Sequence, residues 1–408
     1  MTEHKKLKPE IRFAGFTDDW EQRKLEDVSF SYSGGTPSVN NLSFYGGSIP
    51  FIRSGEINDE TTELFITEEG LNNSSAKLVE KGNILYALYG ATSGEVGRAK
   101  IHGAINQAIL AIVPYVNYDS EFIAQWLRRN KYSIISTYLQ GGQGNLSGEI
   151  VKNLILELPP SKEEQTKIGN FFKQLDDTIA LHQRTLEKYQ KLKISYLEKM
   201  FPKENELYPE LRFPNFTDAW EQRKLGEVVE RITRKNLNLE SRLPLTISAQ
   251  DGLISQTEFF DKQVASKNIS GYYLIENGEF AYNKSYSNGY PWGAIKRLDK
   301  YKNGVLSTLY IVFKPIDVDS QFLVSYFDTT FWHSEIAEIA VEGARNHGLL
   351  NIPVMDFFRI KIKIPKSKEE QTQIGNFFKQ LDDTIALHQR EVEKYKKIKQ
   401  SYLEKMFI

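Results

Sequence analysis

The sequence contains no cysteine, which excludes disulfide bonds and thiolate metal sites. Its start, Met1-Thr-Glu-His-Lys-Lys, lacks an apolar signal region, and no apolar run approaches the roughly 20 residues of a membrane span. We therefore expect a cytoplasmic protein without a membrane partner. The formal net charge of −1 argues against a chain coated in basic residues, although a local stripe facing phosphates is compatible with it.

Catalytic motifs are also missing. The chain has no Asn-Pro-Pro or Asp-Pro-Pro, so the loop of adenine methyltransferases is absent, and the lack of a Gly-Lys dipeptide excludes a P-loop. No proline is followed by aspartate, which removes the commonest signature of restriction nucleases. The six histidines show no metal-ligand spacing. We expect a protein that is not an enzyme and that binds no metal ion or cofactor of its own.

Two internal repeats define the organisation of the chain. Residues 161–201 recur as residues 367–407 with 35 of 41 positions unchanged, and residues 9–25 recur as residues 209–225 with 13 of 17 unchanged. The chain is therefore a tandem duplication. The regions between the repeats, about 30–160 and 230–366, have nearly equal lengths but look unrelated in sequence.

The longer repeat has the heptad pattern of a coiled coil. Its apolar positions alternate at spacings of four and three residues, with polar His182, Lys193, His388 and Lys399 on the same seam. A helix of this length is a rod of about 57 Å, which a head of ordinary size cannot span, so we expect the two helices to pack antiparallel between two heads. The predicted helix-pairing residues are Ile168, Phe172, Leu175, Ile179, Leu186, Ile374, Phe378, Leu381, Ile385 and Val392.

Particular residues of the repeat carry more local expectations. Ser161 and Ser367 are predicted to cap the helices while Glu164 and Glu370 reach back to the caps. The glycines at 169 and 375 indicate either that another backbone approaches closely at these positions or that glycine is merely tolerated there. The lysines at 193 and 399 are expected to cover apolar surface with their stems and to hold their ammonium groups in water.

The heads are predicted to be mixed domains. Short apolar or alternating runs separated by glycine-rich turns indicate strands, and one helix is expected near residues 120–138 with a counterpart near 320–341. The fold class is therefore α+β. The predicted domains are a first head at residues 1–160, a helix at 161–201, a second head at 202–366 and a second helix at 367–408.

This layout predicts a protein that recognises a target made of two different parts. Nearly identical helices suggest equivalent docking surfaces for two copies of one partner, and unlike heads suggest two different ligands. A recent duplication whose helices have not drifted is the alternative, but it would leave the heads as similar as the helices.

Glycine turns with polar and aromatic side chains are the candidate binding segments. Amide, hydroxyl and guanidinium groups of this kind read base edges, although a solvated hairpin tip has a similar composition. In the first head the candidate DNA contacts are Arg53, Tyr89, Thr92, Ser93, Arg98, Asn106, Gln107 and Asn145. In the second head they are Lys284, Ser285, Tyr286, Tyr290, Trp292, Lys296, Arg297, Arg345 and Asn346.

Five segments carry a resemblance to a known family, namely Gly34–Ser38, Ile49–Glu56, Tyr89–Gly97 and the helix entries Leu158–Gln165 and Ile364–Gln371. With these segments the chain resembles, over essentially its whole length, the specificity subunits of type I restriction-modification enzymes. The second head lacks the Gly-Gly-Thr-Pro-Ser pattern of the first and looks like a different subtype of the same target-recognition domain, with Gly278–Ser285 instead.

The resemblance implies a subunit that joins two modification subunits to read an asymmetric, gapped site in double-stranded DNA, with restriction subunits completing a nuclease. Those partners would supply S-adenosylmethionine binding, adenine flipping and methylation, and translocation and cleavage driven by ATP with Mg. Three alternatives remain open: a related system with a fused nuclease-methyltransferase, a scaffold whose heads bind peptides, and a stand-alone enzyme, which the missing motifs disfavour.

Overall fold

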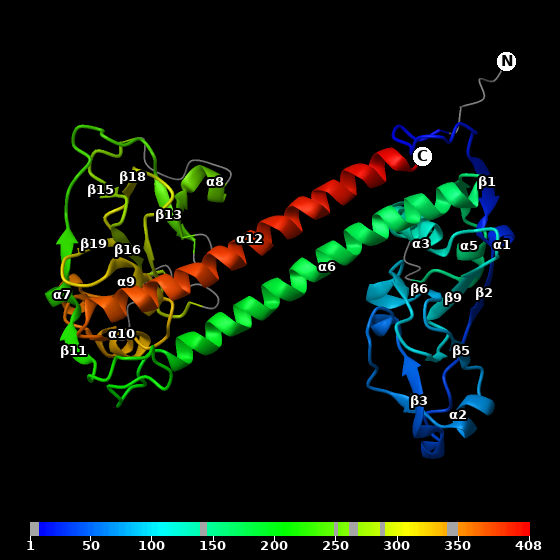
Figure 1. Ribbon diagram of the computed structural model, residues 1–408, viewed down its shortest axis with the longest axis horizontal. Coiled ribbons are helices and arrows are strands. Elements are labelled where there is room, and N and C mark those ends of the chain that lie inside the picture. The colour runs from blue at the N-terminus through cyan, green and yellow to red at the C-terminus, as the bar shows by residue number, and fades with distance from the viewer. Residues whose placement is uncertain (1–7, 139–144, 249–251, 261–267, 286–289, 341–349) are drawn as a thin grey trace. The chain divides into compact units, whose positions relative to one another are not determined.

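The computed structural model describes residues 8–138, 145–248, 252–260, 268–285, 290–340 and 350–408. The chain forms two compact units (Figure 1). Unit 1 contains residues 1–183 and 390–408, and unit 2 contains residues 184–389. Each unit therefore holds one head together with part of each long helix. No helix in the described ranges is long and apolar enough to cross a membrane.

The centre of the first head is a four-stranded antiparallel sheet. Its order is β2 (Ser29–Ser33), β9 (Ile109–Pro114), β6 (Ile84–Ala87) and β7 (Val96–Arg98). Every residue of β6 is buried because the sheet is covered on both faces. Alternate β6 side chains join different cores, one with α3 (Ser120–Arg129) and the other with the outer part of the head.

The outer part of the first head, which we call its distal lobe, has a second sheet. Its order is β4 (Phe65–Ile66), β3 (Tyr45–Ile52), β8 (Gly103–Ile105) and β5 (Lys77–Val79), with β3 and β8 parallel. Short helical elements complete the lobe, namely η1 (Leu42–Phe44), η2 (Ser54–Glu56) and α2 (Glu68–Asn72).

The second head repeats the central sheet despite its unrelated sequence. The order is β12 (Val229–Ile232), β19 (Ile311–Pro315), β16 (Phe280–Asn283) and β17 (Ala294–Arg297). The distal lobe of the second head pairs β13 (Leu245–Ser248) with β14 (Gly252–Ser255), and β15 (Tyr273–Glu276) with β18 (Asn303–Leu306). An isolated parallel bridge between Pro244 and Val305 joins the two pairs, so the order β14, β13, β18, β15 corresponds to that of the first lobe. The helix α8 (Gln256–Phe260) follows β14 as α2 follows β4.

The prediction of a single helix in each head is wrong, since each of these segments is divided into two helices. The first head has α3 and α4 (Lys131–Tyr138), and the second has α9 (Ser320–Phe327) and α10 (His333–Ile339). At each break a short polar side chain bonds a carbonyl of the preceding turn. Asn130 Nδ2 donates to the Trp126 carbonyl, and Thr329 Oγ1 donates to the Tyr326 carbonyl.

The front repeats form two-stranded ladders that lead into the long helices. In unit 1, β1 (Glu21–Lys24) pairs with β10 (Ile155–Leu158), and in unit 2, β11 (Glu221–Lys224) pairs with β20 (Lys361–Ile364). Helices α6 (Lys162–Lys199) and α12 (Lys368–Met406) begin four residues after these ladders. The remaining short helices are α1 (Leu25–Val28), α5 (Gly148–Lys152), α7 (Leu225–Val228) and α11 (Val354–Phe357).

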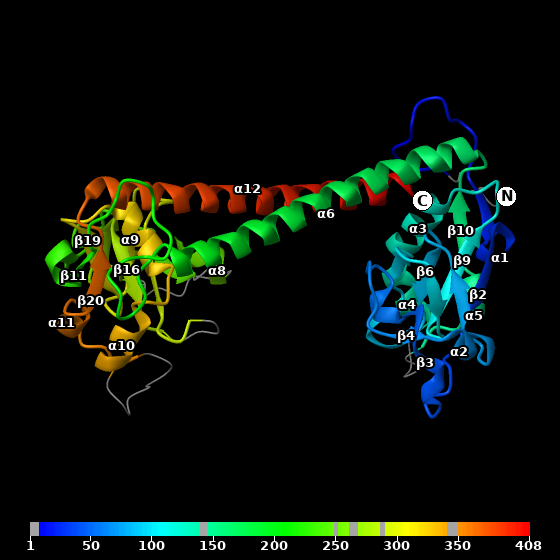
Figure 2. The ribbon, with the colours of Figure 1, turned by 60° about the horizontal axis from the view of Figure 1, so that its bottom comes forward.

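The long helices run antiparallel within each unit, as predicted (Figure 1 and Figure 2). In unit 1 the ring centroids of Phe171 and Tyr402 are 5.1 Å apart, and those of His182 and Tyr395 are 5.7 Å apart. In unit 2, Tyr196 packs on Phe377 and Tyr189 on His388. In both units the residue number rises along one helix while it falls along the other.

The residues of the heptad seam lie in two different environments. Near the helix starts, Ile168, Phe172, Ile374 and Phe378 are at most 2% exposed and belong to the cores of the heads. Further along, the predicted seam is less deeply buried. Ile179, Leu381 and Val392 are buried, whereas Leu175, Leu186 and Ile385 are partly exposed.

The predicted caps are confirmed only for the serines. Ser367 Oγ accepts the backbone N–H of Glu370 at 3.3 Å, and Ser161 Oγ accepts that of Glu164 at 3.5 Å. The glutamate side chains do not reach back, because each binds an arginine of the front repeat. Arg12 donates from Nε and Nη2 to the Glu164 carboxylate at 2.6 and 2.8 Å, and Arg212 binds Glu370 in the same way.

The close approach predicted at the helix glycines is confirmed. A Cβ at Gly375 would lie 2.7 Å from the backbone nitrogen of Phe322, and one at Gly169 would lie 2.8 Å from that of Phe122. We therefore expect Gly375→Ala to destabilise unit 2 by about 1–3 kcal/mol, because the start of α9 must move. The measurement is urea unfolding, with Gly271→Ala as the control, since a Cβ there meets nothing within 4 Å. Equal effects of the two substitutions would contradict this contact.

Candidate nucleic-acid interface

The turn after β6 brings four candidate residues of the first head together. Tyr89 forms an isolated β-bridge with Asn145, and η3 (Gly90–Thr92) follows directly. Thr92 Oγ1 donates to the Tyr89 carbonyl at 3.3 Å. Ser93 is buried and donates to the Gly90 carbonyl at 2.9 Å, so its hydroxyl holds the turn together. At this turn Asn145 is exposed, Tyr89 and Thr92 are half-buried, and Ser93 is buried.

Gln107 lies beside the Gly-Gly-Thr-Pro-Ser segment. The Thr36 hydroxyl donates to Gln107 Oε1 at 2.9 Å, and Gln107 is exposed. Asn106 accepts the backbone N–H of Ala108 and so shapes the same turn. A Cβ at Gly34 would lie only 1.8 Å from the Ile105 carbonyl oxygen, which explains why this segment begins with glycine. Within the described residues, no hydrogen bond engages Gln107 Nε2, which is thus available as a donor.

Arg53 of the distal lobe is held by two carboxylates. Its Nη2 atom bonds Glu56 and Glu63 at 2.5 and 2.7 Å, and its side chain is 47% exposed. The hydrogen bond from Arg53, opposed by burial, lowers the pKa of Glu56 to about 2. The positive charge of Arg53 is therefore compensated locally.

Arg98 and Arg297 turn out to be counterparts in the two heads. Arg98 is opposite Ile84 in the β6–β7 pair, and Arg297 is opposite Phe280 in the β16–β17 pair. Arg98 binds the Ser120 hydroxyl at 2.7 Å and the Glu121 carboxylate at 2.8 Å.

The second arginine makes the same contacts with the helix of its own head. Arg297 binds the Ser320 hydroxyl at 2.9 Å and the Gln321 side-chain oxygen at 2.7 Å. Both guanidinium groups are thus engaged with the first turn of α3 or α9, and each joins its sheet to that helix.

In the second head the described candidates lie between β16 and β17 or on β17 itself. Tyr282 donates its hydroxyl to the Trp292 carbonyl at 2.7 Å, and burial lowers the pKa of Lys284. Ser285 donates its backbone N–H to Asn283, and Tyr290 packs against the core of the distal lobe. The predicted contacts Tyr286, Arg345 and Asn346 lie outside the described residues.

Lys296 belongs to a buried ion network that sequence reasoning missed. Its Nζ atom lies 2.8 Å from Asp328, and Lys193 of α6 lies 2.7 Å from Asp328 and 2.6 Å from Asp382 of α12. Burial favours protonated Asp328, but the two ammonium groups outweigh it and lower its pKa. The expectation that the Lys193 ammonium reaches water is wrong, since its side chain is only 16% exposed.

Unit 1 has a corresponding ion network, but its head contributes Gln125 and Arg128 where the second head contributes Asp328 and Lys296. Lys399 of α12 lies 2.6 Å from Asp176 of α6, so its ammonium group is also paired and not in open water. Asp176 accepts Gln125 Nε2 of α3 at 2.8 Å and lies 3.7 Å from Arg128. The sequence did contain a signal for both ion networks, namely a lysine on the heptad seam. A charge at such a position requires a partner of opposite charge.

Further contacts attach both heads to the helices in the same way. The caps of α3 and α9 are Asp119 and Asp319, and the backbone N–H of each donates to the glutamine at 165 or 371. The same aspartates accept the hydroxyls of Thr166 and Thr372. In both units, equivalent bonds therefore fix the central sheet and its helix (α3 or α9) to the long helices.

Among the residues with described positions, no cluster of histidine, aspartate and glutamate could hold a metal ion.

These observations define a duplicated protein in which two α+β heads sit on two copies of one helix. Residues 17–190 and 217–397 match the family described as the type I restriction modification DNA specificity domain. Because the two matches cover most of its length, the chain belongs to this family.

Two curated relatives are type I restriction enzyme specificity subunits. The chain is 27% identical over 227 residues to the MjaIX subunit of Methanocaldococcus jannaschii, which covers 52% of each chain. It is 26% identical over 195 residues to the EcoR124I/EcoR124II subunit of Escherichia coli, which covers 43% of this chain and 48% of the relative. The alignments thus span about half the length of these relatives.

A solved structure shares the fold. The S subunit of a type I restriction-modification system from M. genitalium matches with a TM-score of 0.67 and 17% identity, over 98% of this chain and 99% of that chain. The predicted α+β class with duplicated heads and helices is confirmed.

Proposed function

We propose that this chain is the non-catalytic specificity subunit of a type I restriction-modification enzyme and reads an asymmetric, bipartite DNA site. The observation that carries the proposal is the contrast between the shared fold of the two heads and their unlike sequences. The sheets have the same strand order and the central sheets have the same bonds to the helices, whereas the side chains at the turns differ. One frame that presents two unlike sets of side chains suits a site with two unlike halves.

We assign base reading to the turns and the distal lobes. In the first head the exposed Gln107 offers an amide that can read a base edge, and Tyr89 and Asn145 lie together at a second turn. In the second head we keep Lys284, Ser285, Tyr290 and Trp292 as candidates. We assign Arg98, Arg297 and Lys296 to positioning, because their charges are already paired or bonded within the chain.

The duplicated helices are the proposed attachment points for two modification subunits. These partners would bind S-adenosylmethionine and methylate adenine, and restriction subunits that join them would use ATP and Mg. A system with a fused nuclease-methyltransferase uses the same recognition frame and remains the second candidate. Either assembly would act on DNA in the cytoplasm.

Mapping of methylated adenines tests the function. The chain is expressed with its modification subunit in a host that lacks other adenine methylases, and modified positions are read by single-molecule sequencing. We expect one asymmetric motif with two specified parts and an unspecified gap. Omission of this chain should abolish methylation at the motif. Methylation of the same sites without this chain would refute its role in DNA recognition.

A further inference from the structure

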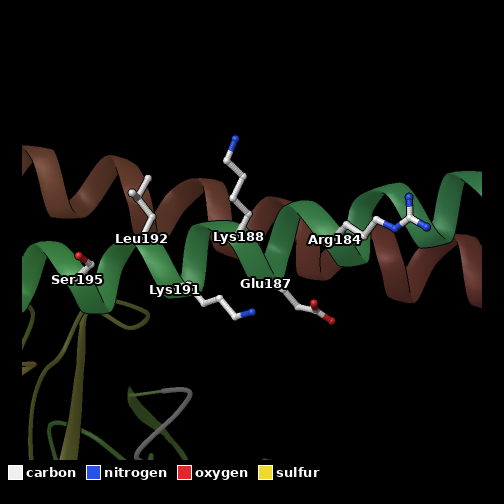
Figure 3. Close-up of a pocket in the computed structure, with 6 residues that line it drawn as sticks. All are labelled: Arg184, Glu187, Lys188, Lys191, Leu192 and Ser195. Carbon is white, nitrogen blue, oxygen red and sulfur yellow. The ribbon is translucent and has the colours of Figure 1, made fainter. Parts of the chain in front are cut away.

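A shallow hollow lies on the surface of α6 within unit 2 (Figure 3). Its volume is about 460 Å³, and it is lined by Arg184, Glu187, Lys188, Lys191, Leu192 and Ser195. In Figure 3 all six labelled side chains project from this one helix. Arg184, Lys188 and Lys191 are spaced by four and three residues, so they share one side of α6 and extend over about 10 Å.

The three cations of this hollow are exposed and uncompensated. Within the described part of the chain, no ion pair involves Arg184, Lys188 or Lys191. Other exposed lysines on α6 behave differently, since Lys167 pairs with Glu163 and Lys173 pairs with Asp177. The hollow therefore combines three positive charges with the single negative charge of Glu187.

The second copy of the helix keeps most of the residues that line the hollow. Five of the six differences between the two copies fall at residues 185–194, so the sequence has drifted where the hollow lies. Five of the six lining residues are nevertheless unchanged, and the sixth, Leu192, becomes isoleucine. The retained counterparts are Arg390, Glu393, Lys394, Lys397 and Ser401 of α12 in unit 1. Their charges are partly compensated in unit 1, since Lys394 pairs with Glu391, which stands in place of Thr185, and Glu393 pairs with Lys396. The uncompensated cluster of cations is therefore a feature of α6 in unit 2.

The composition of the hollow identifies the kind of occupant. The cores of protein interfaces are enriched in aromatic residues and depleted in lysine, glutamate and serine, and aromatic residues supply much of their binding energy. This hollow has no aromatic side chain and contains two lysines, a glutamate and a serine. Arginine, lysine and serine are the side chains that contact DNA phosphates. An anionic backbone fits these residues better than a protein partner does.

We propose that Arg184, Lys188 and Lys191 bind phosphates of the DNA in the gap between the two half-sites. The proposal rests on the proposed bipartite recognition, which leaves a stretch of DNA that neither head reads. Contacts to phosphates carry no sequence information, so they strengthen binding without restricting the bases of the gap.

The test is the salt dependence of DNA binding by the full chain purified with its modification subunit. Fluorescence anisotropy is measured at about 50 to 200 mM salt with a duplex that contains the methylated motif and with an unrelated duplex of equal length. For the triple variant Arg184→Gln/Lys188→Gln/Lys191→Gln, the slope of log K against log salt should fall by up to about 2.7, since each phosphate contact contributes about 0.9. Affinity for both duplexes should fall by the same factor, and the methylated motif should not change.

The matched control is Lys167→Gln/Lys173→Gln/Lys199→Gln. It removes the same charge from the same helix, but these lysines already pair with Glu163, Asp177 and Glu210. Its slope should fall much less. Equal slopes for both triple variants would overturn the phosphate contact, as would loss of the modification subunit from the Arg184 variant with DNA binding retained. If the unaltered complex did not prefer the duplex with the motif, the proposed function itself would fail.

Discussion

Arg12→Ala is expected to destabilise unit 1 by about 3–5 kcal/mol, because it leaves a buried carboxylate without its partner. The Glu164 side chain is 1% exposed, and its two oxygens accept the paired hydrogen bonds of the Arg12 guanidinium. The pair joins the front repeat to the first turn of α6. Its loss should therefore also loosen the front repeat, although Trp20 remains buried in the core of unit 1.

Chemical unfolding with matched variants measures this effect. Arg212→Ala removes the equivalent pair in unit 2, where Glu370 is 2% exposed, and should cost a similar amount. Arg23→Ala breaks an exposed pair with Glu21 and should cost at most about 1 kcal/mol. The double variant Arg12→Ala/Glu164→Leu should recover much of the loss, since no unpaired charge remains. If Arg12→Ala cost no more than Arg23→Ala, the pair would have no role in stability.

Exchange of one head is expected to replace one half of the methylated motif completely and leave the other half unchanged. The designed chimera substitutes residues 230–366 by the corresponding segment of another specificity subunit. The bonds that seat this head include that of the Asp319 carboxylate with Thr372 and that of Asp328 with Lys193. An incoming head that supplies carboxylates at these two positions and apolar side chains where Phe322 packs should dock on the helices.

The reciprocal exchange of residues 30–160 is the control and should change only the other half of the motif. A third chimera carries Asp328→Asn within the incoming head. It should retain the specificity of that head but unfold more easily, because Lys193 loses one of its two carboxylates. If exchange of the second head altered both halves of the motif together, the heads would have to form one continuous recognition surface.

The duplication and the long helices could be predicted because repeated sequence and heptad spacing are local patterns. The shared sheet of the two heads could not. Ile84 and Phe280 occupy the same position in it, and so do Ile112 and Phe313, which pair with them across the sheet. Burial requires only an apolar side chain at such positions, so the fold persists after the sequences have diverged.

The candidate site was harder to predict for a related reason. A polar, glycine-rich segment indicates a turn, but it does not show whether its side chains face a ligand or another part of the chain. The acceptor of Arg98 is Glu121, 23 residues away, and Lys193 bonds residues 135 and 189 positions away. Such partners become visible only when the fold brings them together.

The division of the chain has a consequence for its synthesis. Unit 2 is continuous in sequence, whereas the core of unit 1 needs Phe407, whose ring lies 5.2 Å from that of Phe122 and 5.6 Å from that of Phe172. At about 5–20 residues per second, the first 183 residues wait roughly 10 to 45 s on the ribosome before residue 407 is made. Unit 2, although it is translated later, can complete its core first. During that interval the apolar surface around Phe122 and Phe172 is open, so the earlier-made head is exposed to aggregation for longer than the later-made one.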